Sequence, residues 1–194
     1  MSPRRGLLLV LSGPSGVGKT TITHRLRDRF GGVFSVSATT RPAGPGETDG
    51  VDYHFVTPER FEQDLAAGRF LEYAQVFGRH WYGTPRAPVD ACLAEGRLVM
   101  LDIDVQGALQ VRRSMPEALL VFVLAPSDEE LLRRLRDRGR DDEEAIARRY
   151  AEAQREVAIA RGSGAYDAFI VNADLDATVE QVAGLIGARM ACAG

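Results

Sequence analysis

The chain has 194 residues, of which 45% are hydrophobic and 26% are charged, a balance typical of one globular domain with a sizeable core and not of a disordered chain. No apolar run approaches the roughly eighteen residues that a membrane span needs, and a formal net charge of −3 leaves no basic footprint for nucleic acid. Cys92 and Cys192 have no metal-ligand spacing and suit a reducing compartment. We therefore expect a cytoplasmic protein, a monomer or simple homo-oligomer, that binds neither a membrane nor nucleic acid.

The first predicted element is a buried strand. Residues 7–11 form an unbroken apolar run, as in strands covered on both faces of a parallel sheet. Arginines precede this run, as they do in a signal peptide, but it is short and leads directly into a glycine loop, so we interpret it as a strand. After the loop, apolar residues recur at every fourth position over 22–30 and predict a helix that ends at Gly31 and Gly32.

Pairs of strand and helix recur in the second half of the chain. Apolar runs at 98–101, 119–124 and 168–171 are each followed by a stretch with helical periodicity, and the last of these stretches extends to about Arg189. Repeated strand-helix units predict an α/β fold with a doubly wound, mostly parallel sheet of about five strands.

Two segments interrupt this alternation. Over 33–84, short strand-like pieces are separated by the Gly/Pro-rich stretch RPAGPGETDG and by one helix that Thr57 and Pro58 open. They predict a small α+β insertion with antiparallel hairpins. A second, charge-dense interruption starts at residue 138, lacks apolar periodicity and predicts a mobile lid. Within one domain covering 1–194, we place the core at 1–34 and 86–194, the insertion at 35–85 and the lid at 138–149.

Residues 13–20, GPSGVGKT, match GxxxxGK[ST], the P-loop that holds the phosphates of a nucleoside triphosphate. Glycines let backbone N–H groups turn toward the phosphates, the following helix adds its positive N-terminal end, and the Thr20 hydroxyl can ligate magnesium. Lys19 is the only lysine in the chain. A compact ammonium fits under a closely wrapped loop, whereas a planar guanidinium is too wide. The alternative is a chance match in a glycine turn, which the strand before it and the helix after it disfavour.

The single lysine also excludes two classes of phosphate-transferring protein. A GTPase reads guanine with an Asn-Lys-x-Asp loop, and a protein kinase needs a strand lysine outside its glycine loop. Neither arrangement is available when the one lysine lies in the P-loop.

Asp102 ends one of the buried strands. A carboxylate there can hold magnesium, directly or through water, next to Thr20. The alternative is an aspartate that caps the following helix, which suits Asp104 better than Asp102. On the acceptor side, four side chains that donate hydrogen bonds to anionic oxygens could grip a monophosphate, namely Ser37, Arg41, Tyr53 and Tyr82.

Taken in order, these stretches resemble the guanylate kinase family almost from end to end. The resemblance lies in SGPSGVGKTT, SVSATTR, GVDYHFV, FLEYAQVFGRHWYGTP, LDIDVQG, the arginines 134, 138 and 149, and IVN at 170–172. It implies a P-loop nucleoside monophosphate kinase fold with a core, an acceptor-binding insertion and a lid. It also implies that the γ-phosphoryl of ATP, bound with Mg²⁺, passes to GMP or dGMP in purine nucleotide metabolism and GMP recycling.

The same resemblance implies roles for individual residues. The catalytic residues would be Lys19, Arg134, Arg138 and Arg149. ATP would be bound by Gly13, Pro14, Ser15, Gly16, Val17, Gly18, Lys19, Thr20, Thr21 and Asn172, and its metal by Thr20 and Asp102. GMP would be bound by Ser37, Arg41, Glu47, Tyr53, Glu72, Tyr82, Thr84 and Asp104, with guanine read by Glu72, Thr84 and Asp104.

Glu72 and Thr84 can distinguish guanine from adenine. Guanine presents a ring N–H and an exocyclic amine side by side, so one carboxylate can accept from both, while the Thr84 hydroxyl can donate to the ring oxygen. Adenine lacks that ring donor and would leave buried groups unpaired. On sequence alone, Glu72 could instead be a solvated residue on an exposed strand face.

The chain departs from the family pattern at one position. Family members usually read TTRxPRxGE, with a second arginine that reaches the acceptor phosphate, and here Gly44 stands at that place. Arg69 and Arg79 are candidates to supply the missing charge. We therefore expect weaker binding of the acceptor phosphate than in relatives that have this arginine.

Three alternatives stay open. Guanylate-kinase-like modules use the same insertion to bind phosphopeptides without catalysis, but usually have a degraded P-loop. A kinase for another nucleoside monophosphate is disfavoured by Glu72 and Thr84. The arginine run could be a solvated helix face, and we interpret Arg133, Arg136 and Arg140 in that way.

Overall fold

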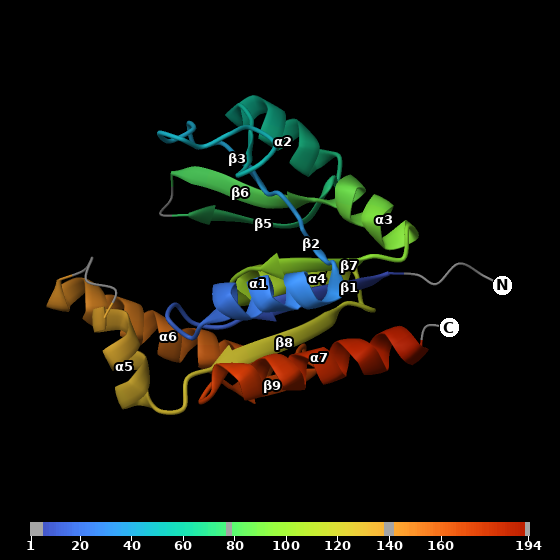
Figure 1. Ribbon diagram of the computed structural model, residues 1–194. Coiled ribbons are helices and arrows are strands. Elements are labelled where there is room, and N and C mark those ends of the chain that lie inside the picture. Colours follow the sequence, from blue (N-terminus) through green and yellow to red (C-terminus); the bar gives the residue numbers. More distant parts are fainter. Residues whose placement is uncertain (1–5, 77–78, 138–141, 193–194) are drawn as a thin grey trace.

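The computed structural model describes residues 6–76, 79–137 and 142–192, and it contains two sheets (Figure 1). The core sheet has five strands in the order β2-β7-β1-β8-β9, and every neighbouring pair is parallel. Its strands are β1 (Leu7–Ser12), β2 (Val33–Phe34), β7 (Leu98–Asp102), β8 (Leu119–Leu124) and β9 (Ala168–Val171). The predicted parallel sheet is confirmed, and β2, at the start of the interrupting segment 33–84, lies in the core sheet and within the range 1–34 assigned to the core.

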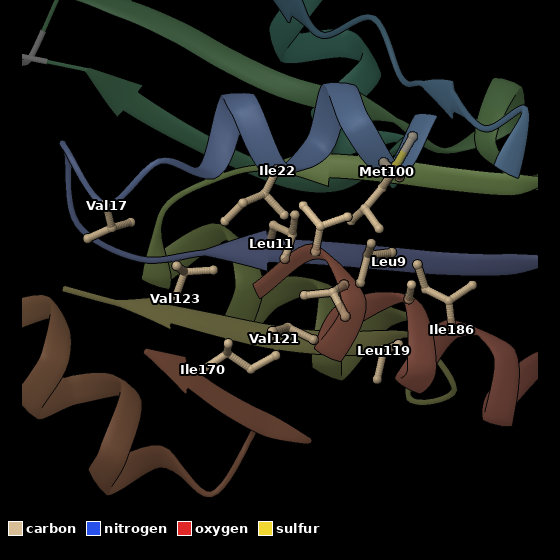
Figure 2. Packing of buried hydrophobic residues seen from close by; sticks show 14 of the residues in the cluster. Leu9, Leu11, Val17, Ile22, Met100, Leu119, Val121, Val123, Ile170 and Ile186 are labelled. Atoms are coloured by element: carbon tan, nitrogen blue, oxygen red, sulfur yellow. The ribbon is translucent and has the colours of Figure 1, made fainter. Parts of the chain in front are cut away.

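Helices cover both faces of the core sheet. One face carries α1 (Lys19–Phe30) and α7 (Leu175–Cys192), and the other carries α3 (Arg86–Ala94) and α4 (Val105–Ser114). Because successive strand residues point to opposite faces, Leu9 of β1 packs with α1 and α7 while Val10 packs with α3 and α4. Figure 2 shows the first of these layers, with Ile22 of α1 and Ile186 of α7 beside the sheet. Two buried layers thus hold β1, and with it the start of the P-loop, in the middle of the domain.

The insertion forms the second sheet, which lies apart from the core sheet in Figure 1. Its order is β4-β3-β6-β5, with strands β3 (Ala38–Thr39), β4 (His54–Phe55), β5 (Phe70–Val76) and β6 (His80–Pro85). The pairs β5/β6 and β3/β6 are antiparallel, as expected, but β3/β4 is parallel. The expected antiparallel hairpin is confirmed for β5 and β6, whereas β3 and β4 pair in parallel because a connection of fourteen residues, 40–53, lets the chain return in the same direction.

Helix α2 (Pro58–Ala66) of the insertion begins where the sequence predicts. The Thr57 hydroxyl accepts a hydrogen bond from the Arg60 N–H at 3.2 Å, and Pro58 occupies the first helical position.

The predicted lid at 138–149 overlaps the start of α6 (Glu143–Ser163), the helix that follows α5 (Asp128–Asp137) in the chain. Residues 138–141, which include Arg138 and Arg140, are outside the described residues. From Glu143 onward the predicted lid forms the first turns of α6, which the Asp142 carboxylate caps by accepting from the Ala145 N–H at 2.7 Å. In the three described ranges, no helix combines the length and apolar character needed to cross a membrane.

Candidate active site

The P-loop begins where β1 ends and runs into the first turn of α1. Gly13 has a φ of 143°, and an added Cβ would lie 2.3 Å from the carbonyl oxygen of Val123 on β8, so only glycine fits there. Lys19 curls back across the loop, and its Nζ donates to the carbonyl oxygens of Gly13 at 2.6 Å and Pro14 at 3.2 Å. The one ammonium of the chain therefore lies within the loop that the motif marks as a phosphate cradle.

Asp102, at the end of β7, lies beside the first turn of α1. The Thr20 hydroxyl donates to Asp102 Oδ2 at 3.2 Å, and Lys19 Nζ is 3.9 Å from Oδ1. Burial raises the pKa of the Asp102 carboxyl, and Lys19 and Thr20 oppose that rise. The capping role falls to Asp104, which accepts from the Gly107 N–H at 2.8 Å at the start of α4.

Thr20 and Asp102 form a donor set that suits Mg²⁺. A hydroxyl and a carboxylate are hard oxygen ligands, and Mg²⁺ usually keeps several waters and takes further ligands from phosphates. Across the described ranges, no group of three or more His, Cys, Asp or Glu side chains could hold a metal. A hydroxyl and one carboxylate leave most positions around a magnesium ion open, so Thr20 and Asp102 fit an ion whose other ligands are water and nucleotide phosphates.

A cavity of about 370 Å³ lies against the P-loop and brings most of the predicted donor-side residues together. Its lining comprises Gly13, Ser15, Gly16, Gly18, Lys19, Thr20, Thr21, Asp102, Ile103, Asp104 and Glu156. Pro14 and Val17 are not among them, and Val17 is fully buried in the core instead.

Glu156 is a cavity residue that the sequence analysis missed. Burial, followed by the nearby carboxylate of Asp104, raises its pKa to about 7, and Lys19 opposes the rise. A signal was present in the sequence: Glu156 lies three residues after Ala153 and four before Ala160, which are both buried on α6. This spacing puts a carboxylate on the inward face of the helix.

Arg41 is the centre of a second cluster, in the insertion. Its guanidinium makes two parallel hydrogen bonds to Glu47, at 2.8 Å each, and its Nε donates to the Tyr82 hydroxyl at 3.1 Å. The ring of Tyr53 lies 5.4 Å from Arg41 Cζ and 5.8 Å from the ring of Tyr82. The hydrogen bonds from Arg41, followed by one from the Gly44 N–H, lower the pKa of Glu47 to about 2. Ser37 immediately precedes β3, the strand that pairs with the strand carrying Tyr82.

Gly44 lies against this cluster. Its N–H donates to Glu47 Oε2 at 2.6 Å, and an added Cβ would lie 3.1 Å from that oxygen and 3.7 Å from Arg41 Nη1. Arg69, one candidate to replace the missing cation, instead pairs with Asp64 at 2.6 Å. It lines a separate cavity of about 590 Å³ that contains none of the predicted site residues.

Glu72 and Thr84 face each other on β5 and β6. They are register partners, the Thr84 hydroxyl donates to Glu72 Oε1 at 2.5 Å, and the two residues are only 7% and 0% exposed. Burial raises the pKa of Glu72, the Thr84 hydroxyl opposes this, and the charge of Asp104 adds to it. The alternative of a solvated Glu72 on an exposed strand face is therefore wrong.

Helix α4 closes this pair from the other side. An added Cβ at Gly107 would lie 3.0 Å from Glu72 Oε2, so the carboxylate packs closely on the helix. The Gln110 amide bonds both the N–H and the C=O of Tyr73, at 3.1 and 2.8 Å, on the edge strand β5. Gln110 belongs to none of the motifs in the sequence analysis. It nevertheless holds β5 of the insertion against α4, the helix that Asp104 caps.

Arg134 lies on α5, and its side chain joins that helix to the residue that follows β9. Its Nε donates to Glu130 Oε1 at 2.7 Å, and its Nη2 donates to the Asn172 carbonyl oxygen at 3.0 Å. Its Cβ is 3.8 Å from where a Cβ on Gly16 would lie, so α5 packs against the P-loop. Asn172 itself lies behind the loop and is absent from the cavity lining.

The other predicted arginines are more peripheral. Arg149 is exposed on α6 and does not line the cavity. Arg133 forms exposed ion pairs with Glu130 and Asp137, and Arg136 forms one with Glu143, as expected for surface residues.

The comparisons with known proteins agree with this geometry. The family described as Guanylate kinase matches residues 5–189. The chain belongs to the guanylate kinase family. The guanylate kinase of Thermosynechococcus vestitus is 52% identical over 176 residues, which cover 90% of each chain. The guanylate kinase of Anaeromyxobacter dehalogenans is 51% identical over 183 residues, which cover 93% of this chain and 80% of that protein.

A solved guanylate kinase, from Anaplasma phagocytophilum, has the same fold. It superposes with a TM-score of 0.73 at 35% identity and covers 98% of this chain and 89% of its own. Membership of the guanylate kinase family, together with the five-stranded parallel sheet, confirms the predicted α/β fold class.

Proposed function

We propose that this guanylate kinase transfers the γ-phosphoryl group of ATP to GMP or dGMP, giving ADP and GDP or dGDP. The observation that carries the proposal is an enclosed carboxylate and hydroxyl, Glu72 and Thr84, in a family member whose P-loop retains its lysine. The intact loop argues against a module that only binds phosphopeptides. The buried Glu72 argues against a kinase for another monophosphate.

ATP binds along the P-loop with its outer phosphates in the cavity. Lys19 exchanges the carbonyl oxygens of Gly13 and Pro14, its present partners, for phosphate oxygens. Thr20 and Asp102 would hold the Mg²⁺ that comes with the nucleotide, and the ion would supply positive charge against the outer phosphates.

The phosphate of GMP binds at the Arg41 cluster. The two parallel hydrogen bonds to Glu47 fix the orientation of the Arg41 guanidinium. The pKa of Glu47, lowered to about 2, keeps its carboxylate ionised at neutral pH. The hydroxyl groups of Tyr53, Tyr82 and Ser37 supply further donors to the phosphate.

Guanine is read by Glu72, Thr84 and Asp104. The Glu72 carboxylate accepts from the ring N–H and the exocyclic amine, and the Thr84 hydroxyl turns from Glu72 to the ring oxygen. Because Glu72 and Thr84 are buried, a base without those groups leaves them unpaired, which disfavours AMP. Two guanine donors also favour the ionised form of Glu72, against the rise in pKa that burial causes.

The phosphoryl group passes from donor to acceptor under arginine side chains. Arg134 is already anchored beside the loop, and we assign Arg138 and Arg149 to the lid at 138–149, which closes over the substrates and excludes water. Planar guanidinium groups suit the charge that spreads over the transferred group. We assign the enzyme to the cytoplasm, as a monomer or simple homo-oligomer in GMP recycling.

The test is a coupled assay of ADP formation with GMP, dGMP, AMP, UMP and dTMP as acceptors. Turnover with the two guanine nucleotides alone supports the proposal. Turnover with another base would make the enzyme a different monophosphate kinase. GMP binding without turnover would identify a binding module.

A further inference from the structure

Asn172 follows β9, and its side chain points into the molecule behind the P-loop. The residue is 6% exposed, and its backbone N–H still donates to the Leu124 carbonyl oxygen at 2.8 Å, so its main chain belongs to the sheet. Its Nδ2 donates to the carbonyl oxygen of Val17 at 2.8 Å, and the Thr178 hydroxyl donates to its Oδ1 at 3.0 Å. The side chain therefore joins the sheet and α7 to the loop.

Only one orientation of the amide satisfies both neighbours. The Val17 carbonyl can only accept a hydrogen bond, so the amide nitrogen has to face it, since a flipped amide would set two oxygens against each other. The donor that faces Oδ1 is the Thr178 hydroxyl at 3.0 Å, which shares its proton with the Asp174 carbonyl oxygen at 2.7 Å. The amide is thus held from both sides.

The carbonyl that Asn172 holds belongs to the same peptide group as the Gly18 N–H. In a planar trans peptide these two groups point in opposite directions, and no peptide bond among the described residues is cis. Val17 is fully buried, whereas Gly18 lines the phosphate cavity. Holding the carbonyl from the buried side therefore directs the Gly18 N–H toward the cavity, where a phosphate oxygen can accept it.

Residue 18 is matched to this contact. Gly18 has a φ of 94°, and an added Cβ would lie 2.6 Å from Asn172 Nδ2. The amide thus occupies the space that any larger residue at position 18 would need. Only glycine lets the side chain of Asn172 approach the loop so closely.

We propose that Asn172 is a positioning residue, which fixes the Val17 peptide group from behind so that the Gly18 N–H faces the phosphates of the donor nucleotide. Its carbonyl oxygen also accepts from Arg134, so the same residue orients the loop and one arginine beside it. The inference rests on the proposed function, because it assumes that phosphates bind in the P-loop cavity. It assigns Asn172 to the phosphates through the loop and not to the adenine base.

Calorimetric binding to Asn172→Ala and the parent protein, with three ligands, tests this role. ATP and inorganic tripolyphosphate are each titrated with Mg²⁺, and GMP serves as an internal control for folding. Loss of one oriented donor to a charged phosphate should weaken both triphosphates by the same factor, about tenfold, and leave GMP binding unchanged. Thr178→Val leaves the Asn172 side chain in place and removes the hydroxyl that steadies its amide, together with the bond from that hydroxyl to the Asp174 carbonyl oxygen. It should weaken the same two ligands by a smaller factor, about threefold.

The other outcomes overturn the inference. Weaker ATP binding with unchanged tripolyphosphate binding would mean that Asn172 contacts the base. Unchanged binding of both triphosphates, or an equal loss for GMP, would mean that the residue has no specific role at the loop. If Asn172→Ala does not fold, unchanged triphosphate binding by Thr178→Val would overturn it as well. If the parent protein binds neither triphosphate, the proposed function fails and this inference fails with it.

Discussion

Replacing Glu156 with glutamine should stabilise the protein at neutral and alkaline pH but not at acid pH. Burial raises the pKa of Glu156 from an ordinary 4.5 to about 7. Between these values the folded state binds more protons than the unfolded state, so the free energy of unfolding falls as the pH rises through this window. The full shift corresponds to about 3 kcal/mol. Because Glu156 is only partly buried, solvent screening reduces the expected effect to about 1 kcal/mol.

Urea unfolding at pH 4.5 and pH 8 measures this effect. The stability gap between Glu156→Gln and the parent should be small at the lower pH and about 1 kcal/mol wider at the higher pH. Glu152→Gln, at an exposed position one turn earlier on the same helix, is the matched control. Because the charge of Glu152 makes only a minor contribution to the raised pKa of Glu156, this variant should show a much smaller change with pH. An equal stability gap at both pH values for Glu156→Gln would refute the reasoning, since it would mean that folding does not raise the pKa of the Glu156 carboxyl.

Three further substitutions probe the donor and acceptor sites. Lys19→Ala should lower kcat by at least about a hundredfold while circular dichroism stays unchanged, because the ammonium stabilises charge on the outer phosphates; turnover as fast as the parent's would contradict the P-loop assignment. Gly44→Arg should lower the KM for GMP by about threefold, because it adds a second cation beside Arg41; an unchanged or higher KM in steady-state assays would count against it. Thr84→Val leaves the buried Glu72 without its hydroxyl partner, so the protein should lose about 1–3 kcal/mol of stability and much of its preference for GMP over AMP. A preserved preference would exclude Thr84 from base recognition.

Features that depend on neighbours in the chain could be predicted from the sequence. The unbroken apolar run at β1 indicates burial on both faces, and the glycines and Lys19 of the P-loop follow within eight residues. The Thr57–Pro58 start of α2 was predicted correctly because a cap and a fixed φ act within one helical turn. The acceptor residues were named from family resemblance, but only the structure shows Arg41, Glu47 and Tyr82 in contact.

The rest depended on how distant segments pack. The parallel pairing of β3 with β4 is a contact between strands that no local pattern encodes. The raised pKa of Glu156 arises from burial beside the P-loop, and a pKa shift of this kind exists only once the fold has removed water. The phosphate-binding loop and the α/β class could be predicted from residue order alone, because both follow from local spacing. The place of Asn172 behind the loop emerges only in the folded chain, because it requires β9, α7 and the P-loop to meet.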